Sequence, residues 1–134
     1  MAGTLVANTI NTDTGLFSTN NAYSGIAKAW VTFTGGNGNT AGTVSASFNV
    51  SSVTVNGSAD YTVNFSTAMP NTVYCVICGC QEDEGNSTLN GNRILSPART
   101  TTALQTTSVR LVSSYTAGGS QNNIYYGYVA IFSA

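Results

Sequence analysis

The chain has 134 residues, of which only 7% are charged, and its formal net charge is −1. The length suggests one domain, and the 4 basic residues are too few and too scattered for the basic stripe that nucleic-acid binding requires. No apolar run approaches membrane-spanning length, and the first residues lack the charged-then-apolar pattern of a secretion signal. Polarity comes instead from Thr, Ser, Asn and Gly, which suits an extracellular or virion setting, or subunits packed against each other.

All the predicted elements are β-strands, because runs of Val, Thr, Tyr, Phe and Ile are separated by clusters of Gly, Asn and Ser. No stretch combines helical periodicity with caps. In chain order the pattern predicts strands at 5–10, 26–33, 43–50, 53–55, 61–65, 73–79, 109–112 and 123–132.

The turn signal Asn56-Gly57 predicts an antiparallel hairpin, with a bulge or a wider turn because the apolar runs lie more than two residues apart. In the preceding strand, Val44, Ala46, Phe48 and Val50 are expected to form one buried face. Roughly seven or eight short strands indicate an all-β fold, an antiparallel β-sandwich of jelly-roll-like form. We expect residues 1–22 to be an extended segment for anchoring or oligomerisation and residues 23–134 to form the sandwich.

Two predicted strands are apolar on both faces. Residues 73–78 alternate between two apolar sets, and residues 124–132 do the same. One face of an antiparallel strand normally meets water, so the second apolar face needs a cover, and a subunit interface is the simplest one. The expected interface residues are Tyr74, Val76, Cys78, Tyr126, Tyr128 and Phe132.

All three cysteines, Cys75, Cys78 and Cys80, lie in the first of these strands or just beyond it. Side chains alternate along a strand, so Cys75 should point away from the other two, and thiols on two faces cannot close a tetrahedral metal site. A Cys78–Cys80 disulfide is also unfavourable, since the Cα atoms would lie about 6.5–7 Å apart. We interpret the cysteines as buried, reduced, small apolar residues, and we expect no metal and no cofactor.

The chain contains no histidine, which removes the commonest general base and most zinc and copper ligand sets. Glu82-Asp83-Glu84 is interpreted as a solvated loop tip, with a calcium site as the alternative. A glycosidase site would need a second carboxylate about 5–9.5 Å away, and only two other carboxylates remain. Aromatic residues such as Trp30 could stack on sugars, but in strands they more often form a core or an interface. We therefore do not expect an enzyme.

Three stretches of the chain resemble a C-terminal module of bacteriophage tail-fibre and related virion proteins, of the kind found in cyanophages and other marine phages. They are SGIAKAWVTFTG (24–35), ASFNVSSVTVNGSADYTVNFSTAMPNTVY (46–74) and NNIYYGYVAIFSA (122–134). The opening GTLVANTINTDTG (3–15) is similar to the particle-proximal start of such proteins, and residues 80–121 match least. The most specific part, NVSSVTVNG followed by DYTVNF and AMP, is not a catalytic motif.

The resemblance implies a trimeric, β-rich module on the virion surface that takes part in host recognition. We therefore expect a non-enzymatic virion protein, a short tail fibre or receptor-binding knob for host attachment. The alternative is a capsid-decoration or head-fibre protein attached by its N-terminal strand. Proteins of this kind usually carry the module after a long shaft, whereas only about 25 residues precede it here, so a knob, a tip or a decoration fits better than a long fibre.

The expected partners are further copies of the chain, other tail or capsid proteins, and a host cell-surface glycan, with no nucleic acid and no membrane insertion. The chain would be made in the host cytoplasm and exposed on the particle. Recognition residues usually lie on loops over a rigid scaffold, so the candidates are Asn37, Asn39, Glu82, Asp83, Glu84, Asn90 and Tyr115 in loops 35–42, 81–92 and 115–122. An extended tract can add to a sheet edge, so Leu5, Val6 and Ile10 are the candidate anchor to the particle.

Overall fold

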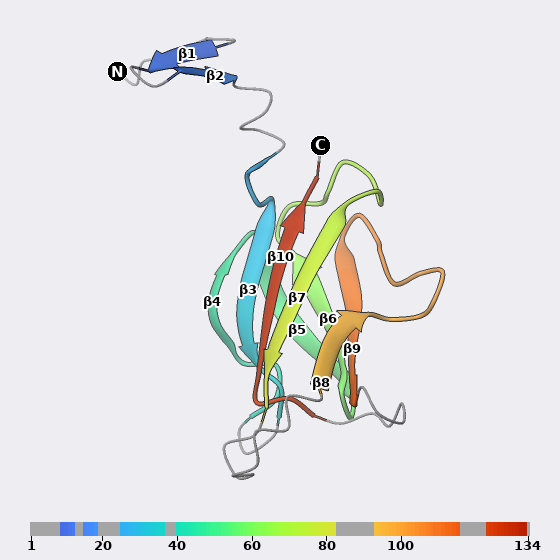
Figure 1. Cartoon of the computed structure of the whole chain (residues 1–134). Helices are drawn as coiled ribbons and strands as arrows, with labels where there is room; N and C mark the ends of the chain where they lie inside the picture. The colour runs from blue at the N-terminus through green and yellow to red at the C-terminus, as the bar shows by residue number, and fades with distance from the viewer. Residues whose placement is uncertain are drawn as a thin grey trace.

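The structure, a computed structural model, describes residues 9–12, 15–18, 25–36, 40–82, 93–115 and 123–133. Within these ranges the strands are β1 (Thr9–Thr12), β2 (Gly15–Ser18), β3 (Ala29–Thr34), β4 (Val44–Phe48), β5 (Val50–Gly57), β6 (Asp60–Phe65), β7 (Cys75–Gln81), β8 (Arg93–Pro97), β9 (Ser108–Tyr115) and β10 (Tyr126–Phe132). Besides the hairpin β1-β2, they form two antiparallel four-stranded sheets, in the orders β4-β3-β10-β7 and β5-β6-β9-β8. Figure 1 shows these sheets as the two layers of a sandwich. The predicted all-β antiparallel fold is confirmed, and the jelly-roll-like form stays a prediction.

The core lies between the two sheets and is built by strand alternation. On β6, Tyr61, Val63 and Phe65 are buried while their neighbours are only partly so, as the sequence predicts. The Tyr61 ring packs on Phe33 with ring centroids 5.2 Å apart. Its hydroxyl donates a hydrogen bond of 2.6 Å to the backbone carbonyl of Gly35, so the one polar atom of this large buried side chain is satisfied. The expected bulge in the β5–β6 hairpin is present, between Val55 and Gly57.

The predicted strand at 43–50 is in fact two strands that belong to different sheets. Asn49 has a positive φ of 53°, which ends β4 and lets the chain cross to β5 in the other layer. The prediction that Ala46 and Phe48 are buried is wrong, because Ala46 is exposed and the Phe48 side chain is 54% exposed. A register shift between Thr32 and Phe33 sets the pairing of β3 with β4, and Phe48 then lies opposite the outward-pointing Trp30.

Strand β8 was not predicted. Its sequence RILSP is short, begins with a charge and ends in proline, and Leu95 is its only buried residue. Such a segment shows neither clear alternation nor a continuous apolar run. Its pairing with β9, in which Leu95 lies opposite Ser113, supplies the order that its own pattern lacks.

The outward face of β5, β6 and β9 is polar and hydrogen-bonded within itself. The Asn64 side-chain amide donates to the hydroxyls of Thr54 at 2.9 Å and Ser52 at 3.0 Å. Asn56 donates to the Thr62 hydroxyl at 2.9 Å and to the Asp60 carboxylate at 3.0 Å. Neighbouring strands thus satisfy one another's polar groups, and this face is compatible with water.

We expect the Asp60–Arg110 pair on this face to give stability a small acid-sensitive component. The Arg110 guanidinium donates to the Asp60 carboxylate, with Nε to Oδ1 at 2.9 Å, and this bond holds the pKa of Asp60 below its usual value against the opposing effect of burial. A carboxyl whose pKa is lowered by folding stabilises the fold above its unfolded-state pKa of about 3.9 and loses that contribution as the pH falls through the folded-state value.

Urea unfolding of the wild type and of Asp60→Asn, from about pH 7 down to about pH 2.5, measures this contribution. The stability difference between the two proteins should shrink once the pH falls below about 4. A difference that stays constant over the whole range would contradict the assignment.

Candidate functional site

The outward side of the sheet β4-β3-β10-β7, here called the outer face, is apolar. The strand registers place Phe48, Trp30, Ala130 and Ile77 in one row that crosses all four strands. Phe48, Trp30 and Ile77 are 54%, 41% and 57% exposed, and Tyr128 in the next row is 42% exposed. None of these described outward-pointing residues carries a charge: Ala46, Phe48, Trp30, Thr32, Tyr126, Tyr128, Ala130, Phe132, Cys75, Ile77, Gly79 and Gln81.

The exposed apolar side chains of the outer face form one contiguous patch. Four large side chains at these exposures present roughly 400 Å² of area, taking about 200 Å² for each whole side chain. Single exposed apolar residues need no explanation, whereas the largest contiguous patch on a typical monomer covers about 300–600 Å² and is often functional. A shallow groove of about 350 Å³ runs between Trp30, Ile77 and Tyr128. The sandwich therefore has one polar outward face and one largely apolar outward face.

The structure divides the predicted interface residues into two groups. Tyr126, Tyr128 and Phe132 point outward from β10, whereas Tyr74, Val76 and Cys78 face the interior of the sandwich. The assignment of these last three to an interface was wrong, because the outward side of β7 carries Cys75 and Ile77 instead.

Tyr74 shows this inward placement most clearly. It is 8% exposed, and its ring lies edge-on to Phe65 with centroids 6.1 Å apart. Its hydroxyl donates to the Gln105 carbonyl at 2.9 Å. Each of these contacts is made inside the subunit, so Tyr74 stabilises the fold.

The three cysteines lie on the two sides of β7 as alternation predicts. All three are free thiols, and Cys75 is exposed on the outer face while Cys78 and Cys80 are partly buried toward the core. The expectation that all three are buried is therefore wrong for Cys75. Burial, with a smaller effect of the neighbouring Cys80, raises the pKa of Cys78 to about 11. Burial also raises the pKa of Cys80.

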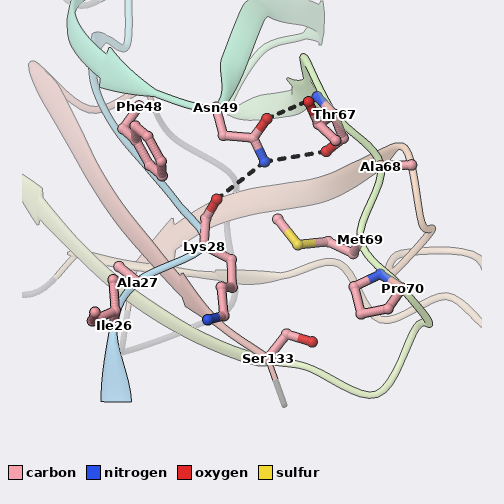
Figure 2. Close-up of a pocket in the computed structure, with 10 residues that line it drawn as sticks. All are labelled: Ile26, Ala27, Lys28, Phe48, Asn49, Thr67, Ala68, Met69, Pro70 and Ser133. Atoms are coloured by element: carbon pink, nitrogen blue, oxygen red, sulfur yellow. Dashed lines mark hydrogen bonds between the residues drawn. The ribbon is translucent and has the colours of Figure 1, made fainter. Parts of the chain in front are cut away.

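An apolar pocket of about 360 Å³ lies at the end of the sandwich where the chain enters β3 (Figure 2). Asn49 organises its rim: its side-chain amide donates to the carbonyls of Lys28 at 3.0 Å and Thr67 at 3.1 Å, and its carbonyl oxygen accepts from the Thr67 amide at 2.7 Å. Phe48 and Met69 line the pocket. Since Phe48 also belongs to the outer face, the apolar surface continues around this end.

The opposite end, here called the loop end, gathers the bases of the three predicted recognition loops. Strands β3, β7 and β9 end there and β8 and β10 begin there (Figure 1). The Gly35 amide donates to the Tyr125 carbonyl and the Tyr125 amide to the Gln81 carbonyl, both at 2.9 Å. Glu82 and Tyr115 are at this end, whereas Asn37, Asn39, Asp83, Glu84 and Asn90 lie outside the described residues.

Arg93, the first residue of β8, lies partly buried within the loop end. Its guanidinium donates to the Asn123 carbonyl and to the Tyr115 hydroxyl, the latter at 3.3 Å. The guanidinium carbon is 5.3 Å from the centre of the Tyr115 ring, a cation–π distance. The buried Nε has no hydrogen-bond partner among the described residues.

Sequence reasoning missed this arginine because its partners lie 22 and 30 positions further along the chain. No local pattern joins Arg93 to Tyr115 and Asn123. The sheet order, which brings the start of β8 to the end of β9 and the start of β10, is what creates the cluster.

In the N-terminal part of the chain the structure describes residues 9–12 and 15–18, which form the hairpin β1-β2 with Ile10 opposite Phe17. The expected anchoring role of this segment stays a prediction. The other candidate anchor residues, Leu5 and Val6, lie outside the described residues, and the division of the chain after residue 22 stays a prediction.

No helix among the described residues is long and apolar enough to span a membrane. The same residues contain no group of three or more His, Cys, Asp or Glu side chains that could hold a metal ion. Comparison of the chain with protein-family models, with curated proteins and with solved structures found no match.

Proposed function

We propose that the protein is a non-enzymatic surface protein of a bacteriophage particle, a homotrimeric short tail fibre or receptor-binding knob that attaches the phage to a host cell. The observation that carries the proposal is the outer face, which is apolar and uncharged across all four strands of its sheet. Burial of this face against copies of the same chain removes it from water and leaves the polar face and the loop end exposed. The resemblance of residues 24–35, 46–74 and 122–134 to a virion module supports the same assembly.

The dimensions of the sheet suit three copies around one axis. Four strands about 4.8 Å apart make a sheet about 19 Å wide. Three such sheets, arranged as the walls of a triangular prism, lie about 5.5 Å from the axis. This distance is close to half of the usual spacing between two packed sheets, which is about 10 Å and places each sheet about 5 Å from the plane midway between them. Side chains of the outer face therefore have the length to fill the space around a threefold axis.

The two ends of the sandwich suggest how the subunit is oriented on the particle. Residues 25–28 enter β3 at the end where β10 also finishes, and the loop end lies at the other side of the sandwich (Figure 1). An anchor in the first residues then places the loop end of the sandwich on the side away from the particle. Loops 35–42, 81–92 and 115–122 are rich in Asn, Ser, Thr and Gly, whose amides and hydroxyls match the hydrogen-bonding groups of a neutral glycan.

The N-terminal hairpin favours a second candidate function, a capsid-decoration or head-fibre protein. Among the described residues, β1 and β2 pair only with each other, so each strand has an outer edge to which a strand of another protein can add. The same outer face and the same trimer would serve in this case. The two candidates differ in where the protein sits on the particle and in whether its loop end binds the host.

Adsorption of the purified protein to host cells tests the receptor-binding proposal. We expect the protein to bind the cells, to compete with phage adsorption, and to occupy tail density in the particle. Density on the head without adsorption would favour decoration, and absence from the particle would overturn both candidates.

Deletion of residues 1–15 should abolish incorporation while leaving a trimer, and retained incorporation would contradict an N-terminal anchor.

We expect Cys75 to report whether the outer face is covered. Only the thiolate reacts with a maleimide, and burial raises the pKa values of Cys78 and Cys80, so these two thiols should react slowly in the folded protein. Cys75 is exposed on the isolated subunit but would be covered in the assembly. Alkylation followed by peptide mass mapping at about pH 7.5 should find Cys75 protected in the wild type. It should find Cys75 labelled in a variant that cannot assemble. Rapid labelling of Cys75 in the wild type would contradict the interface.

A further inference from the structure

We propose that the apolar pocket beside Asn49, here called the end pocket, is completed by Val73 of a neighbouring copy of the chain. Each subunit would place its own Val73 in the pocket of one neighbour and receive the Val73 of the other. The inference rests on the threefold assembly of the proposed function, and it names a contact that closes that assembly.

Val73 is an apolar side chain that the fold holds out in solvent. It is 84% exposed, the highest value among the exposed large apolar side chains of the described residues. Its amide donates a hydrogen bond of 2.8 Å to the side-chain oxygen of Asn71. The next residue, Tyr74, is buried, and its hydroxyl donates to the Gln105 carbonyl at 2.9 Å. Because Tyr74 faces the core, Val73 projects to the opposite side, as Cys75 does.

The end pocket offers an apolar hollow that such a side chain can enter (Figure 2). Phe48 and Met69 line it, and the Asn49 side chain holds two of its walls together by donating to the carbonyls of Lys28 and Thr67. Its volume of about 360 Å³ is many times the ~30 Å³ that one water molecule takes in the liquid. It therefore has room for the isopropyl group of a valine, and burial of that group removes apolar surface from water.

The strand registers place Val73 and the end pocket at the same end of the sheet but at opposite edges. Val73 lies two residues before Cys75, which pairs with Phe132 at the end of β10. Residues 26–28 line the pocket and come directly before β3, which begins beside the end of β10. Across the sheet, Val73 precedes the edge strand β7, whereas Phe48 ends the other edge strand, β4.

A threefold axis along the strands brings these two features of neighbouring copies together. When three sheets form the walls of a triangular prism, the β7 edge of one copy adjoins the β4 edge of the next. Rotation about the axis keeps like ends of the sheets at the same height, so Val73 of one copy meets the end pocket of the next. The contact joins two different surfaces, and such a heterologous contact leaves nothing unfilled only when it closes into a ring.

The apolar area available favours a second copy as the occupant of the end pocket. The large apolar side chains of the outer face present roughly 400 Å², and a threefold arrangement divides this area between two neighbours. Stable interfaces bury about 800 Å² on each partner, so the outer face alone supplies too little. Val73 and Ile26, which are 84% and 61% exposed, and the walls of the end pocket extend the apolar contact beyond it.

Charge placed at position 73 tests the contact, because Lys28 lines the end pocket and none of the described lining residues is an acid. Either charge would have to be desolvated on assembly, but a lysine at position 73 would also be repelled by Lys28, whereas a glutamate would be attracted. The measurement is the dissociation midpoint, the concentration at which half of the trimer is dissociated in a dilution series. Val73→Lys should raise this midpoint at least about tenfold more than Val73→Glu does.

A second background identifies Lys28 as the group that position 73 meets. Lys28→Met keeps the length of the side chain and removes its charge, so in this background Val73→Lys and Val73→Glu should raise the midpoint equally. Ile94→Lys and Ile94→Glu are the matched controls, because Ile94 is 46% exposed and lies on the other sheet. Neither should move the midpoint, and the circular dichroism of every variant should match that of the wild type.

Val73→Thr serves where a charged variant fails to fold. Threonine nearly keeps the shape of valine and adds a hydroxyl, which would lose its bonds to water in the end pocket. We therefore expect a midpoint raised severalfold, since burial of an unpaired hydroxyl is unfavourable. An unchanged midpoint in this variant would contradict burial of Val73.

The outcomes separate this contact from the assembly itself. A wild-type trimer whose midpoint is unchanged by Val73→Lys would overturn the contact and leave the threefold assembly standing. Equal effects of the two charges at position 73, or a difference that persists in Lys28→Met, would place Val73 away from the end pocket and also overturn it. A wild type of one or two subunits would overturn both. Adsorption to host cells decides the recognition part of the proposed function separately.

Discussion

Ile77→Asp on the outer face should convert the assembled protein to monomers without unfolding the subunit. Ile77 is 57% exposed on the isolated chain, so its replacement removes little from the core. In the proposed assembly each copy would instead bury a carboxylate against the apolar outer face of a neighbouring copy. Desolvation of this carboxylate should weaken association by more than about 3 kcal/mol per subunit.

Ile94→Asp is the matched control for this prediction. Ile94 is also an exposed isoleucine in a strand, 46% exposed on β8, but it lies on the other sheet. Sedimentation velocity should give a monomer for Ile77→Asp and the wild-type assembly for Ile94→Asp, with the β-sheet circular dichroism of both unchanged. Dissociation of both variants alike, or of Ile94→Asp alone, would refute the assignment of the interface to the outer face.

Gly127→Ala should be among the most destabilising single substitutions in the core. A Cβ at this position would lie 2.4 Å from Cζ and 2.5 Å from Cε1 of Phe33, distances that real side chains do not tolerate. Phe33 is fully buried between the sheets and packs on Tyr61, so its ring cannot move aside cheaply. Overpacking of this kind costs roughly 2–3 kcal/mol, which corresponds to a fall in melting temperature of about 10 °C for a domain of this size.

Gly57→Ala provides the control, since a Cβ there would meet nothing within 4 Å. Its effect on the free energy of unfolding should be within about 0.5 kcal/mol. Thermal unfolding must be compared at equal protein concentration, because association shifts the apparent stability. Equal stability of Gly127→Ala and Gly57→Ala would show that Phe33 has room to move and would contradict the packing described for this core.

The strands that could be predicted are those in which one face differs clearly from the other. On β6, Tyr61, Val63 and Phe65 alternate with polar residues, and the structure buries that set. The two-faced apolar pattern of β7 and β10 also proved informative, because each strand carries exposed apolar side chains opposite its buried ones.

The sequence could not decide which apolar set of β7 faces inward. Tyr74, Val76 and Cys78 form one set and Cys75 and Ile77 the other, so hydrophobicity gives no contrast between the two faces. A strand reverses its faces when its register moves by one residue, and only the pairing with β10 fixes that register. Phe48 was misplaced for a related reason, since the register shift between β3 and β4 is not visible in the alternation of β4 itself.

The loop-end cluster was beyond prediction because it depends on the order of strands across two sheets. Arg93, Tyr115 and Asn123 come from two strands and one connection, and their separations in sequence carry no periodic signal. Contacts of this kind follow from topology. The chemistry of the loops, rich in amides and hydroxyls, was readable from composition, whereas the arginine that joins their bases was not.

Sedimentation equilibrium of the full chain tests most directly whether the outer face is covered by further copies of the protein. We expect a mass of three times the 13.8 kDa subunit at about 100 µM, because two further copies would remove the apolar side chains of the outer face from water. Twice the subunit mass would keep the face covered but contradict the threefold arrangement. A single species of 13.8 kDa at about 100 µM, the concentration at which even a weak interface is half occupied, would contradict self-association through this face.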